Sequence, residues 1–119
     1  MGVLAEKSLD FGVRIIKFSK FLNEKKEFVI SKQILRSGTS IGANISEAKY
    51  AESKLDYIHK LSIAQKECSE TLYWLDLMLR SEILTDNEYQ SLHSDCDELL
   101  RIITSSLKTL KNNLSKGSS

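Results

Sequence analysis

Apolar side chains recur at helical spacing along most of this chain, in four segments separated by short polar stretches. The spacing predicts helices over about residues 4–22, 28–49, 54–80 and 86–111. Because the connecting stretches are short, successive helices are expected to run antiparallel. The sequence therefore predicts an all-α fold, an antiparallel up-down-up-down four-helix bundle.

Two polar stretches mark where the third and fourth helices begin. Residues 53–56 (Ser-Lys-Leu-Asp) and 85–88 (Thr-Asp-Asn-Glu) each place a hydroxyl three residues before a carboxylate, which is the pattern of a capping box. No internal repeat or second domain interrupts the pattern, so residues 1–111 are expected to form one bundle. Residues 112–119 are polar, which predicts a frayed C-terminal tail.

The second predicted helix contains a run of small residues. The part from Ser37 to Ser40 could instead form a turn, because small polar side chains compete with helical hydrogen bonds. Continuous helix is favoured, since the apolar period keeps its phase across the run. Glycine costs about 1 kcal/mol relative to alanine inside a helix. Gly38 and Gly42 therefore predict the close approach of another helix, inside the bundle or between subunits.

The composition agrees with a helical bundle. The chain has 119 residues, no proline and 5 glycines. Its two cysteines, Cys68 and Cys96, fall within helical patterns, which indicates buried, reduced thiols rather than a disulfide framework. The chain shows neither a signal-peptide pattern nor an apolar run of about 20 residues, so a cytoplasmic protein without membrane contact is expected.

Charge is unevenly distributed along the chain, although the net charge is only +1. Residues 1–66 hold 12 Lys/Arg and 7 Asp/Glu, residues 67–100 hold 1 and 9, and residues 101–119 hold 4 and none. Folding could gather these residues into a basic region and an acidic region. Each region is open to three interpretations: a solvated surface, a subunit contact or a partner site.

Residues 31–48 (SKQILRSGTSIGANISEA) resemble the hallmark segment of a bacterial four-helix-bundle family. This family includes the proteins encoded in intervening sequences of large-subunit ribosomal RNA, formerly labelled ribosomal proteins. Residues 70–75 (ETLYWL) are similar to its second signature, and the similarity covers roughly residues 4–111. The resemblance implies an antiparallel bundle and a ring-shaped homopentamer. Surplus apolar residues such as Val13 and Ile16 independently favour self-association.

A related branch of the family is the accessory protein of diversity-generating retroelements, which works with a reverse transcriptase and nucleic acid. This relationship directs attention to the basic residues of the N-terminal half. The candidate residues for binding RNA or DNA backbones are Arg14, Lys17, Lys20, Lys25, Lys26, Lys32 and Arg36. In a ring, repeated patches would add weak phosphate contacts. The sequence shows no base-reading motif or basic-aromatic pattern, and a solvated basic face is the alternative interpretation.

Four further residues join Gly38 and Gly42 as candidates for helix packing or oligomer contact. Asn44 and Glu47 share a helix face, which predicts either a hydrogen-bonded pair or contact with a neighbouring subunit. Tyr73 and Trp74 are adjacent, so one is expected to face the core and the other the solvent. Acidic neighbours make the outward aromatic more suitable for a subunit contact than for stacking on a base.

No catalytic motif, phosphate-binding loop or complete set of metal ligands is evident, so no catalytic residue, metal or cofactor is expected. His93 and Cys96 share one helical turn, but a zinc site usually needs about four ligands. The sequence predicts a non-enzymatic, oligomeric adaptor that binds nucleic-acid backbones. The alternative is a helical protein-protein interaction scaffold with no nucleic-acid role, whose acidic segment receives a basic protein.

Overall fold

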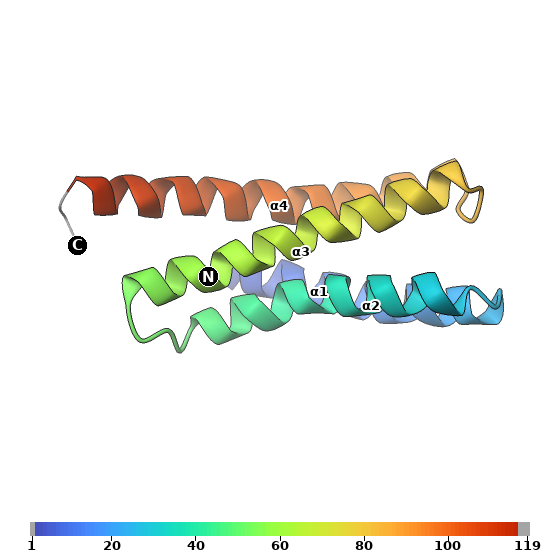
Figure 1. Ribbon diagram of the computed structural model, residues 1–119, viewed down its shortest axis with the longest axis horizontal. Coiled ribbons are helices and arrows are strands. Elements are labelled where there is room, and N and C mark those ends of the chain that lie inside the picture. The colour runs from blue at the N-terminus through green and yellow to red at the C-terminus, as the bar shows by residue number, and fades with distance from the viewer. Residues whose placement is uncertain (1, 117–119) are drawn as a thin grey trace.

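Four antiparallel helices make up almost all of residues 2–116, the part of the chain that the computed structural model describes (Figure 1). They are α1 (Gly2–Glu24), α2 (Phe28–Ala48), α3 (Lys54–Arg80) and α4 (Asp86–Ser115). The α1–α2 and α3–α4 turns lie at one end of the molecule and the α2–α3 turn at the other, along an axis of 52 Å. The predicted all-α antiparallel bundle is confirmed.

The last helix is longer than the sequence analysis expected. α4 continues through Ser115, so residues 112–115 are helical rather than frayed. The reason is Leu114, which extends the spacing of Ile103, Leu107 and Leu110 and packs against the core. Residues 117–119 of the expected tail lie outside the described residues. None of the helices within residues 2–116 is both long and apolar enough to cross a membrane.

α2 passes through the run of small residues without a break, so the predicted continuous helix is confirmed. The hydroxyls of Thr39 and Ser40 donate to the carbonyl oxygens of Leu35 and Arg36, one turn earlier, each at 2.6 Å. These bonds satisfy the polar side chains while the backbone keeps its own helical bonds.

The two glycines of this run allow α1 and α2 to approach closely. A Cβ built on Gly42 would lie 3.2 Å from the carbonyl oxygen of Ser8, and one built on Gly38 would lie 2.8 Å from the Ile15 side chain. The two helices can therefore touch where side chains would hold them apart. The predicted close approach is confirmed, and it lies inside the bundle.

Buried hydroxyl groups pair across the same helix contacts. The Ser19 and Ser31 hydroxyls share a 2.6 Å hydrogen bond between α1 and α2, and the Thr71 hydroxyl donates to that of Ser37 at 2.9 Å between α3 and α2. Within residues 2–116, no buried side-chain nitrogen or oxygen lacks a partner. Buried polar groups must be paired to be tolerated, so these bonds help to fix how the helices align.

Cys68 of α3 and Cys96 of α4 meet in the core, where the Cys96 thiol donates to the Cys68 carbonyl oxygen at 3.5 Å. Contact with the Cys68 side chain and burial both raise the pKa of the Cys96 thiol. A thiol with a raised pKa forms little of the reactive thiolate. The prediction of buried, unpaired cysteines is confirmed.

Side-chain caps begin α3 and α4 where the sequence predicts them. Thr85 and Glu88 form a reciprocal capping box, in which the Glu88 N–H donates to Thr85 Oγ1 at 3.3 Å and the Thr85 N–H donates to Glu88 Oε1 at 2.9 Å. Ser53 caps α3, because its hydroxyl accepts the N–H of Asp56 at 3.0 Å. The Asp56 carboxylate accepts the backbone N–H of Glu52 at 3.1 Å rather than that of Ser53, so the reciprocal capping box predicted at residues 53–56 is only half formed.

The turns after α1 and α3 close in the same way. Lys26 and Glu82 adopt left-handed backbone angles, with φ of 63° and 62°. The next residues, Glu27 and Ile83, each donate an N–H to the carbonyl oxygen five residues earlier at 2.9 Å. This is the Schellman motif, whose left-handed position favours glycine. A lysine and a glutamate thus occupy equivalent positions in two turns at one end of the bundle.

α1 leaves a row of apolar side chains in solvent. Leu9, Val13 and Ile16 follow helical spacing and are exposed, Leu9 to 65%. Together with Gly42 and Ala43 of α2, they line a shallow groove of about 450 Å³ between the two helices. The surplus apolar surface that the sequence predicts at Val13 and Ile16 is therefore present in the folded chain.

Candidate nucleic-acid interface

The fold divides the seven predicted basic residues into two arginines that bind carboxylates and five lysines that do not. All seven lie on α1, on α2 or in the turn between them. Within residues 2–116, five of them form no ion pair: Lys17, Lys20, Lys25, Lys26 and Lys32. The two groups have different capacities to bind an external anion.

Arg14 reaches from α1 to α4, two helices that touch only along a short stretch. Its guanidinium donates to Asp95 Oδ2 at 2.7 Å, to the Ser91 carbonyl oxygen at 3.1 Å and to the Ser91 hydroxyl at 2.6 Å. An arginine with three acceptors inside the protein must give up some of them before it can hold a phosphate. Arg14 therefore stabilises the α1–α4 contact first.

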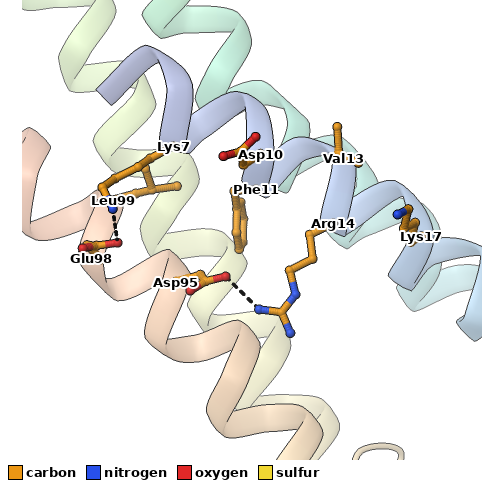
Figure 2. Close-up of a pocket in the computed structure, with 9 residues that line it drawn as sticks. All are labelled: Lys7, Asp10, Phe11, Val13, Arg14, Lys17, Asp95, Glu98 and Leu99. Atoms are coloured by element: carbon orange, nitrogen blue, oxygen red, sulfur yellow. Dashed lines mark hydrogen bonds and ion pairs between the residues drawn. The ribbon is translucent and has the colours of Figure 1, made fainter. Parts of the chain in front are cut away.

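The groove between α1 and α4 is lined by charges of both signs (Figure 2). Lys7 of α1 pairs with Glu98 of α4 at 3.2 Å, parallel to the pair between Arg14 and Asp95. In Figure 2 both pairs bridge the two helices, and Lys17 lies at the edge of the groove without a partner among the residues drawn. The groove is electrically balanced and is a poor binding site for an anion.

Arg36 joins α2 to α3. Its guanidinium donates to Glu70 and, at 3.3 Å, to Glu67. Glu70 also accepts the indole N–H of Trp74 at 3.0 Å. The bond from Arg36, together with the bond from Trp74, lowers the pKa of Glu70, and the Glu70 carboxylate raises the pKa of Arg36. Arg36 is thus a charged link between two helices.

Most carboxylates of the acidic segment, residues 67–100, have partners inside the chain. Besides the arginine pairs, the Tyr89 hydroxyl donates to Asp76 at 2.6 Å, a bond that raises the pKa of Tyr89 to about 12. Within residues 2–116, the carboxylates of this segment without such a partner are Glu82 and Asp86. Glu67, Glu70, Asp95 and Glu98 therefore pair with basic residues of α1 and α2 across the helix contacts, whereas Asp76 and Glu88 bond only to neutral groups and keep their charge.

Lys20, Lys25, Lys26 and Lys32 lie in the α1–α2 turn or within one helical turn of it, whereas Lys17 lies further back on α1 at the edge of the α1–α4 groove. Residues 17–32 carry a net charge of +3, since Glu24 and Glu27 lie among the five lysines. The α3–α4 turn lies at the same end of the molecule, and the pKa of Glu88 there, lowered mainly by its bond from the Thr85 N–H, is lowered further by the charge of Lys25. The Lys25 ammonium lies 4.7 Å from the centre of the Phe21 ring, a cation–π contact. The other four ammonium groups are exposed to solvent.

Asn44 and Glu47 do not form the hydrogen-bonded pair that the sequence offered as one possibility. The Asn44 amide donates to the carbonyl oxygen of Ser40 on its own helix at 2.9 Å. The Glu47 carboxylate is exposed and pairs with Lys60 of α3 at 2.9 Å, which raises the pKa of Lys60. The pair does not form because each side chain has another partner. The half-buried Asn44 bonds to its own helix, whereas the exposed Glu47 carboxylate can reach Lys60 and solvent.

Tyr73 and Trp74 point in different directions, as the sequence predicts. Tyr73 is 57% exposed, whereas Trp74 is half-buried and packs against the core. Their rings meet edge to face, with centroids 5.1 Å apart. Glu70 and Asp76 lie three residues before and three residues after Tyr73 on α3, so carboxylates flank its exposed ring.

Comparison with known proteins identifies the family. Residues 3–105 match a family described as 23S rRNA-intervening sequence protein. The chain belongs to this family. A crystal structure of a protein of unknown function from the S23 ribosomal protein family, from Bacteroides thetaiotaomicron, is 55% identical. The two structures have a TM-score of 0.87, over 88% of this chain and 98% of that one. No curated protein matches the chain.

The segment that carries the family resemblance has a structural role. Residues 31–48 include Gly38 and Gly42, which allow α1 to approach, and Arg36, which binds α3. Among the described residues, no three His, Cys, Asp or Glu side chains gather where they could hold a metal ion. The same segment lines the α2 side of the apolar groove, and of the five lysines without an ion pair it contains only Lys32.

Sequence reasoning missed one residue of this surface, Phe28. The sequence analysis treated it only as the first residue of the second helix and found no basic-aromatic pattern. In the structure it is exposed beside the lysines of the α1–α2 turn. The signal was present in the run Lys25-Lys26-Glu27-Phe28, but periodicity alone could not show whether the ring would be buried.

Proposed function

We propose that this protein is a non-enzymatic adaptor that binds RNA or DNA backbones in the cytoplasm as a homo-oligomer. The observation that carries the proposal is the group of five lysines over residues 17–32, which form no ion pair within the described chain. The family description, which names an intervening sequence of 23S rRNA, supports a nucleic-acid partner.

The binding mechanism follows from lysine chemistry. An ammonium on a flexible stem is a point charge that attracts phosphate without fixed geometry. Each such contact releases counterions and adds to affinity without reading sequence. Contacts of this kind are weak, so repeating the patch in a ring would strengthen binding through effective concentration. The pentameric form of that ring rests on the resemblance to the family.

The arginines have a secondary part in this proposal. Arg14 and Arg36 each hold carboxylates on another helix, so they position α1 and α2 relative to α4 and α3. Lys17, Lys20, Lys25, Lys26 and Lys32 make the phosphate contacts. Substitution of the arginines should therefore change stability before it changes the salt dependence of binding.

A salt series tests the proposal. Binding of the protein to a structured RNA and to duplex DNA is measured as salt is raised, and affinity should fall steeply for both. The double variant Lys17→Glu and Lys20→Glu should weaken binding to every sequence alike. Lys108→Glu with Lys111→Glu, on the distant part of α4, changes the net charge equally and serves as the control. Equal loss in both variants would show that net charge, rather than this patch, attracts the nucleic acid.

The second candidate is a protein-interaction scaffold, favoured by the exposed apolar groove between α1 and α2. In our proposal this groove serves self-association. The scaffold requires a basic partner at the acidic segment, where Asp76, Glu82, Asp86 and Glu88 form no ion pair within residues 2–116. If neither nucleic acid binds at low salt while pull-downs recover one specific protein, the scaffold replaces the adaptor.

A further inference from the structure

Two large apolar side chains stand in solvent among the lysines of the α1–α2 turn. Phe28 begins α2 and is 55% exposed, and Val29 beside it is 80% exposed. The following residue, Ile30, packs against the core, so the helix is anchored while these two face outward. Exposed apolar groups next to charged ones commonly mark a contact surface.

Four lysines lie near Phe28, either in the α1–α2 turn or within one helical turn of it. Lys32 is one turn after Phe28, so both lie on the same side of α2. Lys25 and Lys26 occupy the turn immediately before it, and Lys20 lies one turn before the end of α1. We call Phe28, Val29 and these four lysines the turn patch.

The backbone of the turn patch is held in a fixed arrangement. The Glu27 N–H closes the turn on the Leu22 carbonyl oxygen at 2.9 Å, and the Ser31 N–H bonds back to the Glu27 carbonyl oxygen at 3.1 Å. The Ser31 hydroxyl is buried against Ser19. The Phe28 ring is therefore presented from rigid backbone on both sides, which reduces the entropy lost when a ligand covers it.

The chemistry of the turn patch selects one kind of ligand. Ammonium groups attract a polyanion, and an exposed phenyl ring offers a flat face for stacking. In a duplex the bases are stacked on each other and cannot reach the ring, whereas an unpaired strand can offer both phosphates and a free base. From this combination we infer that the turn patch binds unpaired nucleotides, with a base stacked on Phe28 and the flanking phosphates held by lysines. The inference rests on the proposed function and adds which form of nucleic acid is preferred.

Tyr73 provides an internal comparison for this inference. Tyr73 is 57% exposed and Phe28 55%, yet the neighbours of Tyr73 on α3 are Glu70, which pairs with Arg36, and Asp76, which forms no ion pair among the described residues. Because carboxylates repel phosphates, we expect the exposed Tyr73 ring not to bind a nucleic-acid strand. Tyr73 thus combines an edge contact to Trp74 with flanking carboxylates, whereas Phe28 has lysines in the adjoining turn and one helical turn further along α2.

Affinity measurements on matched ligands test the inference. The full-length protein, Phe28→Ala and Tyr73→Ala are each titrated with a short single-stranded RNA and with a duplex of the same sequence. Phe28→Ala should lower affinity for the single strand roughly 5- to 100-fold, the loss typical of one stacked base, and leave duplex affinity unchanged. Tyr73→Ala should change neither. Thermal melting of both variants checks that the fold is intact.

A second measurement reports stacking directly. The chain has 1 tryptophan, Trp74, so Phe28→Trp in a Trp74→Phe background places the sole indole in the turn patch. Its fluorescence should be quenched when the single strand is added and should respond little to the duplex. An indole that lies outside the contact would show no such difference.

The outcomes separate this inference from the proposed function. If Phe28→Ala binds both ligands as the unmodified protein does, the inference is wrong and backbone binding stands. If the unmodified protein binds neither ligand at low salt, the proposed function fails and the inference fails with it. The protein is also tested on phosphatidylserine vesicles. If it binds them through Phe28 and does not bind the single strand, the turn patch contacts a membrane surface and the inference is overturned.

Discussion

Gly38 of α2 lies directly against Ile15 of α1, so that a Cβ at position 38 would lie 2.8 Å from Ile15 Cγ1 and 2.9 Å from Cγ2. Ile15 is fully buried and β-branched, which leaves its side chain little freedom to move. Gly38→Ala should therefore lower the free energy of unfolding by about 1–3 kcal/mol, although alanine is the better helix former. Chemical denaturation measures this change.

Gly12 is the matched control, because a Cβ there would meet nothing within 4 Å. Gly12→Ala should raise the free energy of unfolding by up to about 1 kcal/mol through helix propensity alone. At Gly42 the nearest atom is a backbone oxygen of Ser8, so Gly42→Leu should also destabilise by about 1–3 kcal/mol. An unchanged melting temperature and oligomer size in the leucine variant would contradict the close-approach argument.

Replacing Lys26 should make the protein more stable and, at the same time, weaken its binding to nucleic acid. Its left-handed backbone, with φ of 63°, suits glycine better than lysine. Lys26→Gly should raise the free energy of unfolding by about 1 kcal/mol and remove one phosphate contact, reducing the salt slope of nucleic-acid binding by about 1. Denaturation and a salt series are the two measurements.

Glu82 is the control for that substitution, since it has the same backbone angle in the acidic turn. Glu82→Gly should stabilise the protein similarly and leave nucleic-acid affinity undiminished, because no phosphate contact is lost. If Lys26→Gly bound RNA as tightly as the unmodified protein, Lys26 would have to be removed from the interface.

Trp74 should report the protonation of Glu70. The bond from Arg36, with that from Trp74, lowers the pKa of Glu70 below its ordinary value of about 4.3. The stabilisation from this depressed pKa is full above the ordinary value and is lost as pH falls through the lower pKa of the folded state. Tryptophan emission should accordingly change only below about pH 4.3.

Arg36→Gln supplies the comparison for this titration. Removing the guanidinium should move the emission midpoint to higher pH, because the principal cause of the lowered Glu70 pKa is gone. An identical midpoint in the variant would mean that Arg36 does not control Glu70 in solution.

Self-association should depend on the exposed row of α1. Light scattering at micromolar concentration should give a mass several times that of the 13.5 kDa chain, and Val13→Lys should reduce it by placing a charge in the apolar groove. Leu55→Lys, at an exposed apolar position on α3 outside the groove, is the control and should leave the mass unchanged. A clean monomer for the unmodified protein would remove both the oligomer and the argument from repeated patches.

Local sequence was enough to predict the four helices and most of their boundaries. Thr85 and Glu88 lie three residues apart, so their capping box depends on one turn of chain. The small residues around Gly38 could be recognised as a close approach, since glycine inside a helix needs a compensating contact. The extension of α4 to Ser115 was missed because the polar residues around Leu114 hid the last apolar position of the seam.

The candidate site was only partly predictable. The sequence identified seven basic residues, but the carboxylates that bind Arg14 and Arg36 are 81 and 34 residues away along the chain. The exposure of Phe28 was equally hidden, because a residue at the start of an amphipathic helix can face the core or the solvent without changing the period.

The sequence by itself thus determined the elements, the antiparallel order and the residues of one close helix contact, because each depends on periodicity, short connections and local composition. Tertiary structure alone decided which charges remain available. Packing placed Arg14 against α4 and Arg36 against α3, while the lysines near Lys26 and the ring of Phe28 were left at an open end of the bundle. That division depends on which helices become neighbours, a property of the whole fold that no local pattern contains.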